Sequence, residues 1–362
     1  MRAALFAGLV LACGLRAAAH DPITTKVTWS KEIVRIVTAR CAGCHMKDGV
    51  APMPLTSFED ARPWAKAIKA QVVSRRMPRW PAARGFGEFE NDASLSPFEI
   101  AVIAAWVDGG APKGNARDAP KPARALAAHR PDVTLKLPKR NAPPSGQRQV
   151  FAVPTHLTND RWISGWRFTP SDAAIVQAEF SIEGVGYLGN WVPPERELLL
   201  PGGAGAAMPA KAVVTVTVWY RDATAQQNFP VARPGAAPVL DLFLSAAPPS
   251  RVVQHLDAPC GRTTTAIQSG ELLGFRPVSA RSGESIGVAL RSPAGTTRPL
   301  AWIREFDPGY QVTYRPREHM ALAPGTTLEV DGGGAECRVL VEYLARSESR
   351  GVTGRAVRPP LP

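Results

Sequence analysis

Val213-Val214-Thr215-Val216-Thr217-Val218-Trp219-Tyr220 is the most regular stretch of the chain. Its residues are β-branched or aromatic, and alternate side chains of such a run point to opposite faces of a strand. The stretch therefore predicts a half-buried β-strand and indicates that the surrounding region is built from strands.

Similar short runs surround this strand from residue 131 to residue 346. Proline-rich and glycine-rich turns separate them, and short strands at this spacing are typical of antiparallel sandwiches. We therefore predict two β-sandwiches, at 131–248 and 249–346, followed by a flexible tail at 347–362. The runs before Pro248-Pro249 are 149–153, 174–182, 212–220 and 239–244; those after it are 264–268, 272–278, 285–290, 300–305, 311–314, 327–330 and 338–343.

Residues 25–115 show a helical periodicity instead. Ser96-Pro97-Phe98-Glu99 combines an N-cap, a proline in the first turn and a capping-box carboxylate, which together predict the start of a helix. Apolar residues at helical spacing also follow Ser30 and Thr56. The basic, alanine-rich and proline-rich residues after this region lack such a face and predict a linker at 116–130.

Cys41-Ala42-Gly43-Cys44-His45 follows the first predicted helix and has the pattern Cys-x-x-Cys-His. This pattern is typical of covalent haem c attachment. The two thiols reach the two vinyl groups on one porphyrin edge, and the adjacent histidine binds the iron. We predict one covalent haem c held by Cys41 and Cys44, with His45 as an axial iron ligand.

Three other roles for the cysteine pair remain open. A zinc site needs a second pair of ligands, which the neighbouring sequence lacks. A thioredoxin-like redox pair follows a strand, whereas a helix is predicted before Cys41. A structural disulfide leaves the adjacent His45 unexplained.

Met77 is the predicted second axial ligand of the iron. A full helix separates it from His45 and could carry the chain around the porphyrin edge, whereas Met46 is adjacent to His45 and Met53 is only a short loop away. The alternative is an ordinary apolar contact at Met77, with histidine or water at the iron. Methionine ligation raises the reduction potential relative to two histidines.

The chain carries 43 lysine and arginine residues against 31 carboxylates, a formal net charge of +12. No nucleic-acid motif or long basic run accompanies this excess, so we predict no nucleic-acid partner. Arg75, Arg76, Arg79 and Arg84 bracket Met77. They form either a solvated turn or a basic ring that steers an acidic redox partner protein.

The N-terminus has the features of an export signal. Arg2 precedes an apolar run over residues 3–15, and Ala17-Ala18-Ala19 offers a cleavage site. That run is too short to span a bilayer, and no later stretch predicts a transmembrane helix. A signal peptide at 1–19 implies a periplasmic or secreted protein, and the alternative is a lipid anchor on Cys13.

Cys260 and Cys337 are the two remaining cysteines. An oxidising compartment favours a disulfide between them. Two separate buried thiols are the alternative.

Residues 25–115 resemble the class I cytochrome c domain, especially the versions fused ahead of a copper-monooxygenase-like module. The resemblance implies an all-α haem domain with His45 and a downstream methionine as axial ligands. Relatives often have Met-Pro-Pro-Trp, and Arg79 replaces the second proline here. The stretches that carry the resemblance are 41–45, 51–55, 60–65, 76–78 and 105–112.

Residues 131–345 look similar to the copper type II, ascorbate-dependent monooxygenase module, through stretches 151–155, 160–163 and 304–314. That family holds one copper ion in each of two sandwiches, through imidazole and thioether ligands. Most of those ligands are missing here, so copper is not expected. The aligned positions read Val176-Gln177-Ala178-Glu179, Val218-Trp219-Tyr220 and Pro277-Val278-Ser279-Ala280, and the histidines beyond the linker are His156, His255 and His319.

These patterns predict an all-α cytochrome c-like domain followed by an all-β region of two antiparallel sandwiches. The predicted function is electron transfer by an exported mono-haem protein, whose copper-ligand-deficient β-module serves for docking or binding. One alternative is an oxidoreductase, such as a monooxygenase, in which the haem domain feeds electrons to a site in the β-region. Another is a haem protein that senses redox state or a gas.

Overall fold

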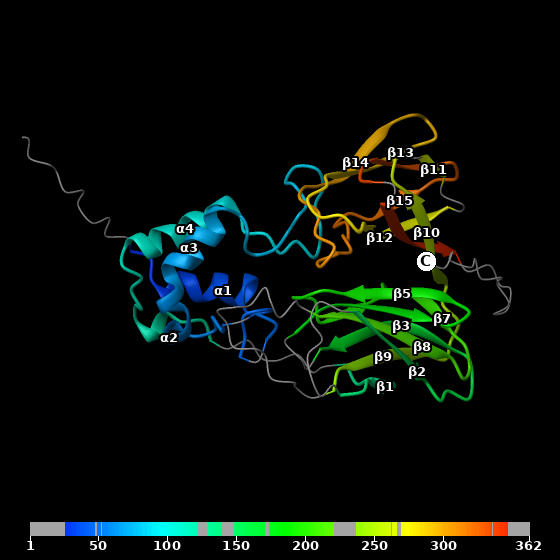
Figure 1. Ribbon diagram of the computed structural model, residues 1–362, viewed down its shortest axis with the longest axis horizontal. Coiled ribbons are helices and arrows are strands. Elements are labelled where there is room, and N and C mark those ends of the chain that lie inside the picture. The colour runs from blue at the N-terminus through cyan, green and yellow to red at the C-terminus, as the bar shows by residue number, and fades with distance from the viewer. Residues whose placement is uncertain are drawn as a thin grey trace, which may run out of the picture.

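The computed structural model describes most of the chain between residues 26 and 346 (Figure 1). The predicted signal peptide at 1–19, the alternative lipid anchor at Cys13 and the predicted tail at 347–362 lie outside the described residues. These residues are 26–47, 49–51, 53–121, 129–139, 148–170, 174–220, 237–261, 263–265, 269–334 and 336–346.

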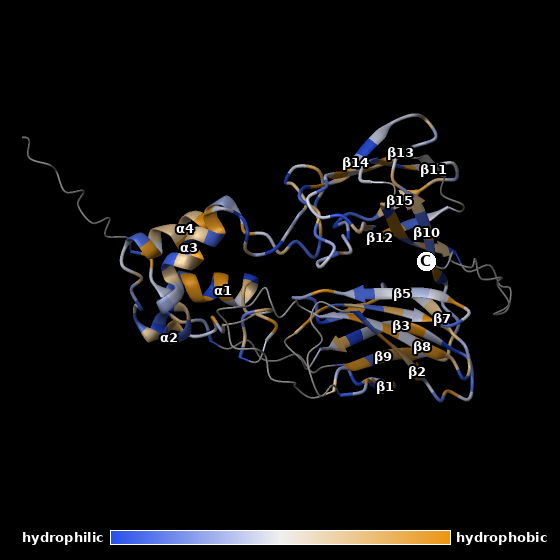
Figure 2. Ribbon diagram, viewed as in Figure 1, coloured by the Kyte–Doolittle hydropathy of each residue, from blue (hydrophilic) through white to orange (hydrophobic). Residues whose placement is uncertain are grey.

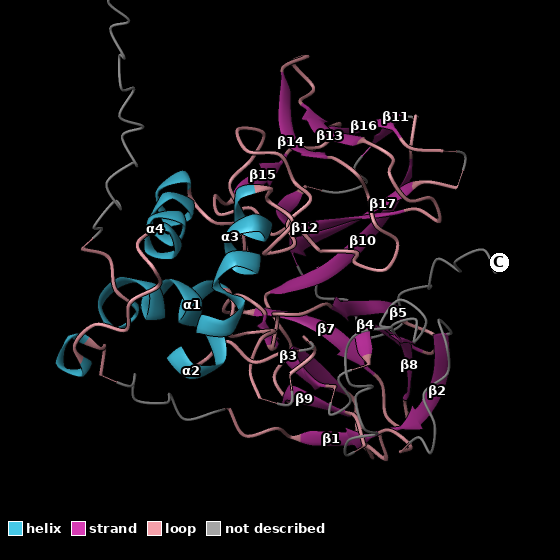
Figure 3. Cartoon of the chain, turned by 60° about the vertical axis from the view of Figure 1, so that its left-hand side comes forward, coloured by secondary structure: helices cyan, strands magenta, loops and turns pink. Residues whose placement is uncertain are grey.

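The prediction of an all-α cytochrome c-like domain followed by two antiparallel sandwiches is wrong. The molecule is predominantly β, and its helices are short (Figure 3). The longest, α4, has twelve residues. The helices are η1 (Trp29–Ile33), α1 (Val34–Arg40), α2 (Phe58–Ala61), η2 (Arg62–Trp64), α3 (Ala65–Val73), α4 (Pro97–Asp108) and η3 (Ala116–Asp118).

Residues 74–96, between α3 and α4, explain part of this error. They contain no helix and instead pair with the C-terminal part of the chain, through bridges between Ala82 and Ile303 and between Phe89 and Pro316. Ala82 and Phe89 are buried in the core of those strands. Helical periodicity is a local signal, so it could not reveal pairing with partners more than two hundred residues away.

Side chains nevertheless cap the N-termini of η1, α2, α4 and η3, and most of the helices share one small core. The Ser96 hydroxyl accepts a hydrogen bond from the Glu99 backbone at 3.1 Å, and the Glu99 carboxylate accepts one from the Ser96 backbone at 2.6 Å. This is the predicted capping box at the start of α4. Trp29, Ile33 and Trp106 are almost fully buried and pack η1 against α4.

The strands of the described residues form three sheets. The largest follows the order β1-β9-β3-β7-β10-β17-β12-β15, with β6 paired to β3, and comprises β1 (Val133–Lys136), β3 (Arg161–Thr169), β6 (Glu197–Leu199), β7 (Ala204–Met208), β9 (Val239–Ser245), β10 (Arg251–Pro259), β12 (Gly270–Val278), β15 (Met320–Leu322) and β17 (Arg338–Arg346). The second sheet has the order β11 (Thr263–Thr265), β16 (Thr327–Gly332), β13 (Ile286–Arg291) and β14 (Thr297–Ile303). The third has the order β2 (Arg148–Pro154), β8 (Val213–Tyr220), β4 (Ile175–Ile182) and β5 (Gly186–Trp191).

We call β1–β9 the first β-unit and β10–β17 the second β-unit. The largest sheet runs through both, because β7 and β10 pair in parallel, with Arg251 beside Ala204 and Val252 beside Gly205. The predicted pair of purely antiparallel sandwiches is therefore wrong in this respect as well. Alternation along a strand is the same in parallel and antiparallel sheets, so the sequence pattern could not reveal this joint.

Each β-unit keeps its own apolar core, which Figure 2 shows as orange segments within the strands. The strand predicted at 213–220 is confirmed as β8, which lies between β2 and β4. Val214, Val216, Val218 and Tyr220 are its buried residues and point into the core of the first β-unit.

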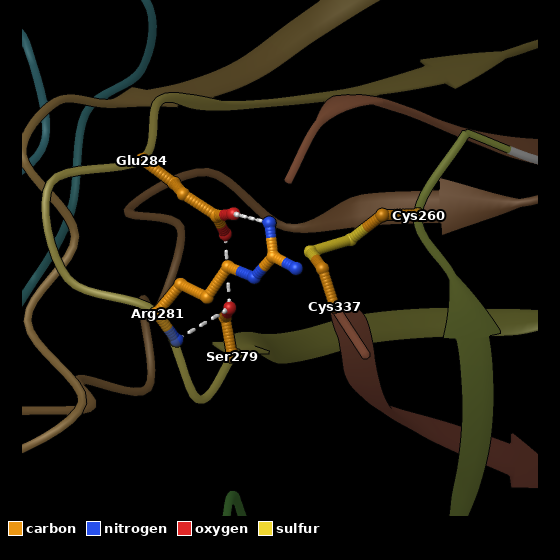
Figure 4. Close-up of a disulfide and its surroundings, with 5 residues drawn as sticks. All are labelled: Cys260, Ser279, Arg281, Glu284 and Cys337. Atoms are coloured by element: carbon orange, nitrogen blue, oxygen red, sulfur yellow. Dashed lines mark hydrogen bonds and ion pairs between the residues drawn. A yellow bond between two sulfur atoms is a disulfide. The ribbon is translucent and has the colours of Figure 1, made fainter. Parts of the chain in front are cut away.

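A disulfide joins Cys260 to Cys337 in the second β-unit (Figure 4). It links the end of β10 to the start of β17, and the Cys260 backbone also donates to the Cys337 carbonyl at 3.0 Å. Beside it, a turn is held by the Ser279 hydroxyl, which donates to the Glu284 carboxylate at 2.9 Å. The structure thus contains the disulfide that an oxidising compartment favours, and not the alternative of two separate buried thiols.

Candidate functional site

The Cys41–His45 segment is a tight turn that continues from the end of α1. The backbone N–H groups of Cys44 and His45 both donate to the Cys41 carbonyl, at 3.1 and 2.9 Å. Cys41, Cys44 and His45 are all half-buried. The turn therefore holds two sulfur atoms and one imidazole on five consecutive residues.

The His45 ring is oriented by a backbone hydrogen bond. Its Nδ1 lies 2.9 Å from the Met53 carbonyl oxygen. A carbonyl can only accept, so Nδ1 carries a proton and donates it to the Met53 oxygen. Such a bond is typical of histidines that bind a metal through the other nitrogen. A further bond, from the Leu55 N–H to the His45 carbonyl at 2.8 Å, fixes the loop around the ring.

The two cysteines of this turn are thiols rather than a disulfide. Burial raises the pKa of Cys41 to about 12, and the negative charges of Cys44 and Glu99 add to this effect against the opposing charge of Arg40. Cys41 is therefore protonated at neutral pH. A thioredoxin-like nucleophile needs a lowered thiol pKa, so this environment does not favour that alternative.

The turn lies where the helices meet the first β-unit. Cys41 packs against the helical core, whereas Cys44 and Val50 pack against the core of the first β-unit. Between the two cysteines, Gly43 touches Pro194 so closely that a Cβ on residue 43 would lie 2.5 Å from the Pro194 Cβ. The β-unit is thus in direct contact with the Cys-x-x-Cys-His turn.

Met77 lies beyond the end of α3 and is 41% exposed. It lines a cavity of about 800 Å³ that is open to one side. Cys41, Cys44 and His45 do not line this cavity. The structure thus keeps Cys41, Cys44 and His45 in one turn. It places Met77 apart from them, in the segment after α3 that lines the cavity.

The predicted arginine cluster gathers at the same cavity. Arg75, Arg76, Arg79 and Arg84 all line it, together with Arg304 from the second β-unit. Arg79 forms an ion pair with Asp307, and Arg84 donates to the Ser94 hydroxyl and the Leu95 carbonyl.

Tyr310 connects the three parts of the molecule, and no local pattern in the sequence indicates this role. Its hydroxyl lies 2.9 Å from the Pro193 carbonyl of the first β-unit and 3.3 Å from the Arg79 carbonyl. The Arg79 guanidinium also stacks on the Tyr310 ring, 4.4 Å from its centre. Burial, and then the nearby Cys44, raise the pKa of Tyr310, so its hydroxyl is a proton donor at neutral pH.

His156, His255 and His319 lie in different parts of the β-units. His156 is an exposed loop residue, and His319 is exposed with its Nδ1 against the Glu271 carboxylate. His255 lies on β10, with its ring edge-on to Tyr187. The described residues contain no group of three or more histidine, cysteine, aspartate or glutamate side chains placed to hold a metal ion.

No family model matches the chain. No curated protein matches it either. The resemblance to a class I cytochrome c domain fused to a copper type II, ascorbate-dependent monooxygenase module is therefore wrong: neither family matches, the molecule is mostly β, and the described residues lack a metal-ligand cluster. The sequence stretches that suggested this resemblance are short. Their similarity to the two families did not predict the fold of the chain.

Among solved structures, a turret protein of Sulfolobus turreted icosahedral virus matches over 55% of this chain and 97% of its own. The two chains are 10% identical, and the TM-score is 0.16. The likeness is too low to support any statement about this protein.

Proposed function

We propose that the protein carries one haem c bound covalently through Cys41 and Cys44, and that it transfers electrons outside the cytoplasm. The observation that carries this proposal is the Cys41–His45 turn, which brings two thiols and one imidazole together and in which the Met53 carbonyl orients the His45 ring. The proposal rests on this motif and its geometry.

The residues of the turn fit the chemistry of haem attachment. Each thioether forms when a cysteine S–H adds across a porphyrin vinyl group, so the sulfur binds one carbon and the hydrogen goes to the other. The reaction needs thiols, and Cys41 and Cys44 are thiols here. Because the porphyrin supplies four iron ligands, the protein needs only one or two, and no larger cluster of metal-binding side chains is required.

A bound haem supplies one-electron exchange at its iron. His45 and Met77 are the residues that would bind the iron. The bond from His45 to the Met53 carbonyl would fix the ring plane and make the imidazole more basic. A methionine thioether on the iron would favour its reduced form and so raise the reduction potential.

We further propose an acidic redox partner protein. Arg75 and Arg76 are exposed beside Met77, and a positive surface accelerates encounters with an acidic partner at low salt. No helix among the described residues is long and apolar enough to cross a membrane.

The proposed location is the periplasm or the outside of the cell, with a lipid anchor on Cys13 as the alternative. The apolar start of the chain and the Cys260–Cys337 disulfide support export, since disulfides persist in oxidising compartments.

Production of the full chain together with a haem-attachment system tests the proposal. We expect one iron per chain, a low-spin haem spectrum and pigment that stays with the protein in acid–acetone. Cys41→Ser combined with Cys44→Ser should abolish this retention, and His45→Ala should remove the low-spin spectrum. As a matched control, Cys260→Ser with Cys337→Ser should retain the haem. Colourless wild-type protein, or pigment that the solvent extracts, would contradict the proposal.

A further inference from the structure

We infer that the open cavity between residues 72–100 and residues 302–310 binds a small aromatic anion, such as an aryl phosphate or an aromatic carboxylate. We call it the arginine cavity, after the five arginines in its lining: Arg75, Arg76, Arg79, Arg84 and Arg304. This ligand is distinct from the haem of the proposed function, since no residue of the Cys41–His45 turn lines the cavity. Met77 lines it but contributes neither a charge nor an aromatic ring.

Pairing between two distant backbone segments builds the arginine cavity. Ala82 and Ile303 form an antiparallel bridge, where the segment between α3 and α4, cyan in Figure 1, reaches the second β-unit. Beside it, the Arg304 N–H donates to the Pro81 carbonyl at 3.1 Å. Ile303 is buried in the core of that unit. Because alternate side chains of an extended chain point to opposite sides, Trp302 and Arg304 point away from this core, and both line the cavity.

The size of the arginine cavity suits an organic molecule. Its volume is about 800 Å³, which falls within the ~300–1,000 Å³ that is usual for small-molecule sites. The cavity is open to one side, so a ligand of this size can enter it from solvent.

Positive charge dominates the arginine cavity. Five arginines line it against two carboxylates, and one of these, Asp307, already pairs with Arg79. Arg75, Arg76 and Arg304 are exposed, and their guanidinium groups form no ion pair or hydrogen bond with any described residue. Guanidinium groups bind phosphate and carboxylate oxygens through paired, charge-assisted hydrogen bonds. The lining therefore favours an anion over a cation or a neutral molecule.

Two aromatic side chains in the lining provide a surface for a ring. Phe86 and Trp302 come from the two separate segments and meet nearly at right angles, with ring centres 5.1 Å apart. They remain 36% and 42% exposed, so a flat ring can stack on the surface that they leave open. Trp302 and Arg304 lie on the same side of an extended segment, ~7 Å apart along it. This spacing suits a ligand that carries its anionic group directly on an aromatic ring.

Calorimetric titration of the full chain in phosphate-free buffer at low salt tests the inference. The probes are 2-naphthyl phosphate and 2-naphthoate, which combine a ring with a phosphate or a carboxylate. Inorganic phosphate and neutral 2-naphthol each carry only one of the two features. We expect both naphthyl anions to bind about fivefold more tightly, or better, than either single-feature probe. The tighter of the two naphthyl anions identifies the preferred anionic group.

Two variants with exposed side chains separate the charge from the ring. Arg304→Gln should weaken binding of both naphthyl anions about fivefold and leave 2-naphthol unchanged. Trp302→Ala should weaken the naphthyl anions about fivefold and leave inorganic phosphate unchanged. Arg298→Gln is the control for charge, since Arg298 is exposed on β14 and pairs with Glu318 outside the cavity. Phe98→Ala is the control for the ring, since Phe98 is 76% exposed and does not line the cavity.

Three results would overturn the inference. They are the absence of binding by both naphthyl anions, equal affinity for inorganic phosphate and 2-naphthyl phosphate, and equal losses in the variants and their controls. None of these results bears on the proposed function, because retention of the pigment in acid–acetone tests covalent haem separately.

Discussion

At the scale of single residues, Gly43 is the position at which the Cys-x-x-Cys-His turn packs against the first β-unit and at which a side chain would not fit. Glycine leaves room for the Pro194 ring, and a Cβ would overlap it at 2.5 Å. We predict that Gly43→Ala lowers the free energy of unfolding by ~1–3 kcal/mol, the usual cost of overpacking. Urea unfolding measures this change. Gly202→Ala is the control, since nothing lies within 4 Å of its new Cβ, and equal losses in the two variants would contradict the argument.

His255 is the residue from which we expect a dependence of stability on pH. Burial, and then the nearby Arg276, lower the pKa of His255 to about 4. The unfolded side chain has a pKa of about 6.5, so below that pH the unfolded state binds a proton that the folded state rejects. The penalty grows as the pH falls from ~6.5 to ~4 and then levels off, and it reaches the order of 3 kcal/mol.

The test for His255 compares wild type with His255→Phe, which keeps an aromatic ring beside Tyr187. Urea unfolding at several pH values between 4 and 7 should show a steeper loss of stability in the wild type than in the variant. Parallel curves for the two proteins would show that His255 does not titrate in this way.

At the scale of elements, the sequence patterns predicted correctly those helices and strands that local interactions determine. Strand β8 and the start of α4 follow from alternation and from the Ser96 capping box. The region at 74–96 and the parallel pair β7–β10 depend on partners far away in sequence, and no periodicity carries that information. The same holds for the site: the Cys41–His45 turn is contiguous, whereas Tyr310 reaches it only through tertiary contacts.

The disulfide is the element-scale constraint whose loss is simplest to measure. It ties the end of β10 to the start of β17 across a sequence separation of 77 residues. Closing a loop of this length in the unfolded chain gives a stabilisation of ~4 kcal/mol. We predict that Cys260→Ser with Cys337→Ser lowers the free energy of unfolding by about this amount, measured by urea unfolding against untreated wild type. Reduction of the wild type should produce a similar loss, and a loss under ~1 kcal/mol in both would contradict the prediction.

At the scale of the whole molecule, a buried polar network joins the two β-units across their shared face. Arg276 on β12 donates to the Glu179 carboxylate on β4 at 2.7 Å. Asn190 on β5 donates to the Gln311 carbonyl at 2.8 Å. The same face carries the buried Glu342, whose pKa burial raises against the opposing charges of Arg315 and Arg276. The units are therefore joined both by the continuous sheet and by buried polar and charged side chains that stabilise one another across the shared face.

This joint predicts that the two β-units unfold together and that Arg276 is essential to it. Its guanidinium is almost fully buried, whereas the Glu179 side chain is 34% exposed. Arg276 also offsets the charge of the fully buried Glu342. Removal of one partner from a buried ion pair costs up to ~3–5 kcal/mol, because a buried charge is left unpaired. Arg276→Met should lower the free energy of unfolding by this amount, whereas Arg291→Met, which removes the exposed pair with Glu329, should cost at most ~1 kcal/mol. Thermal unfolding of wild type should show one transition for both units. Two separate transitions, or equal costs in the two variants, would mean that the units are stable independently and merely lie in contact.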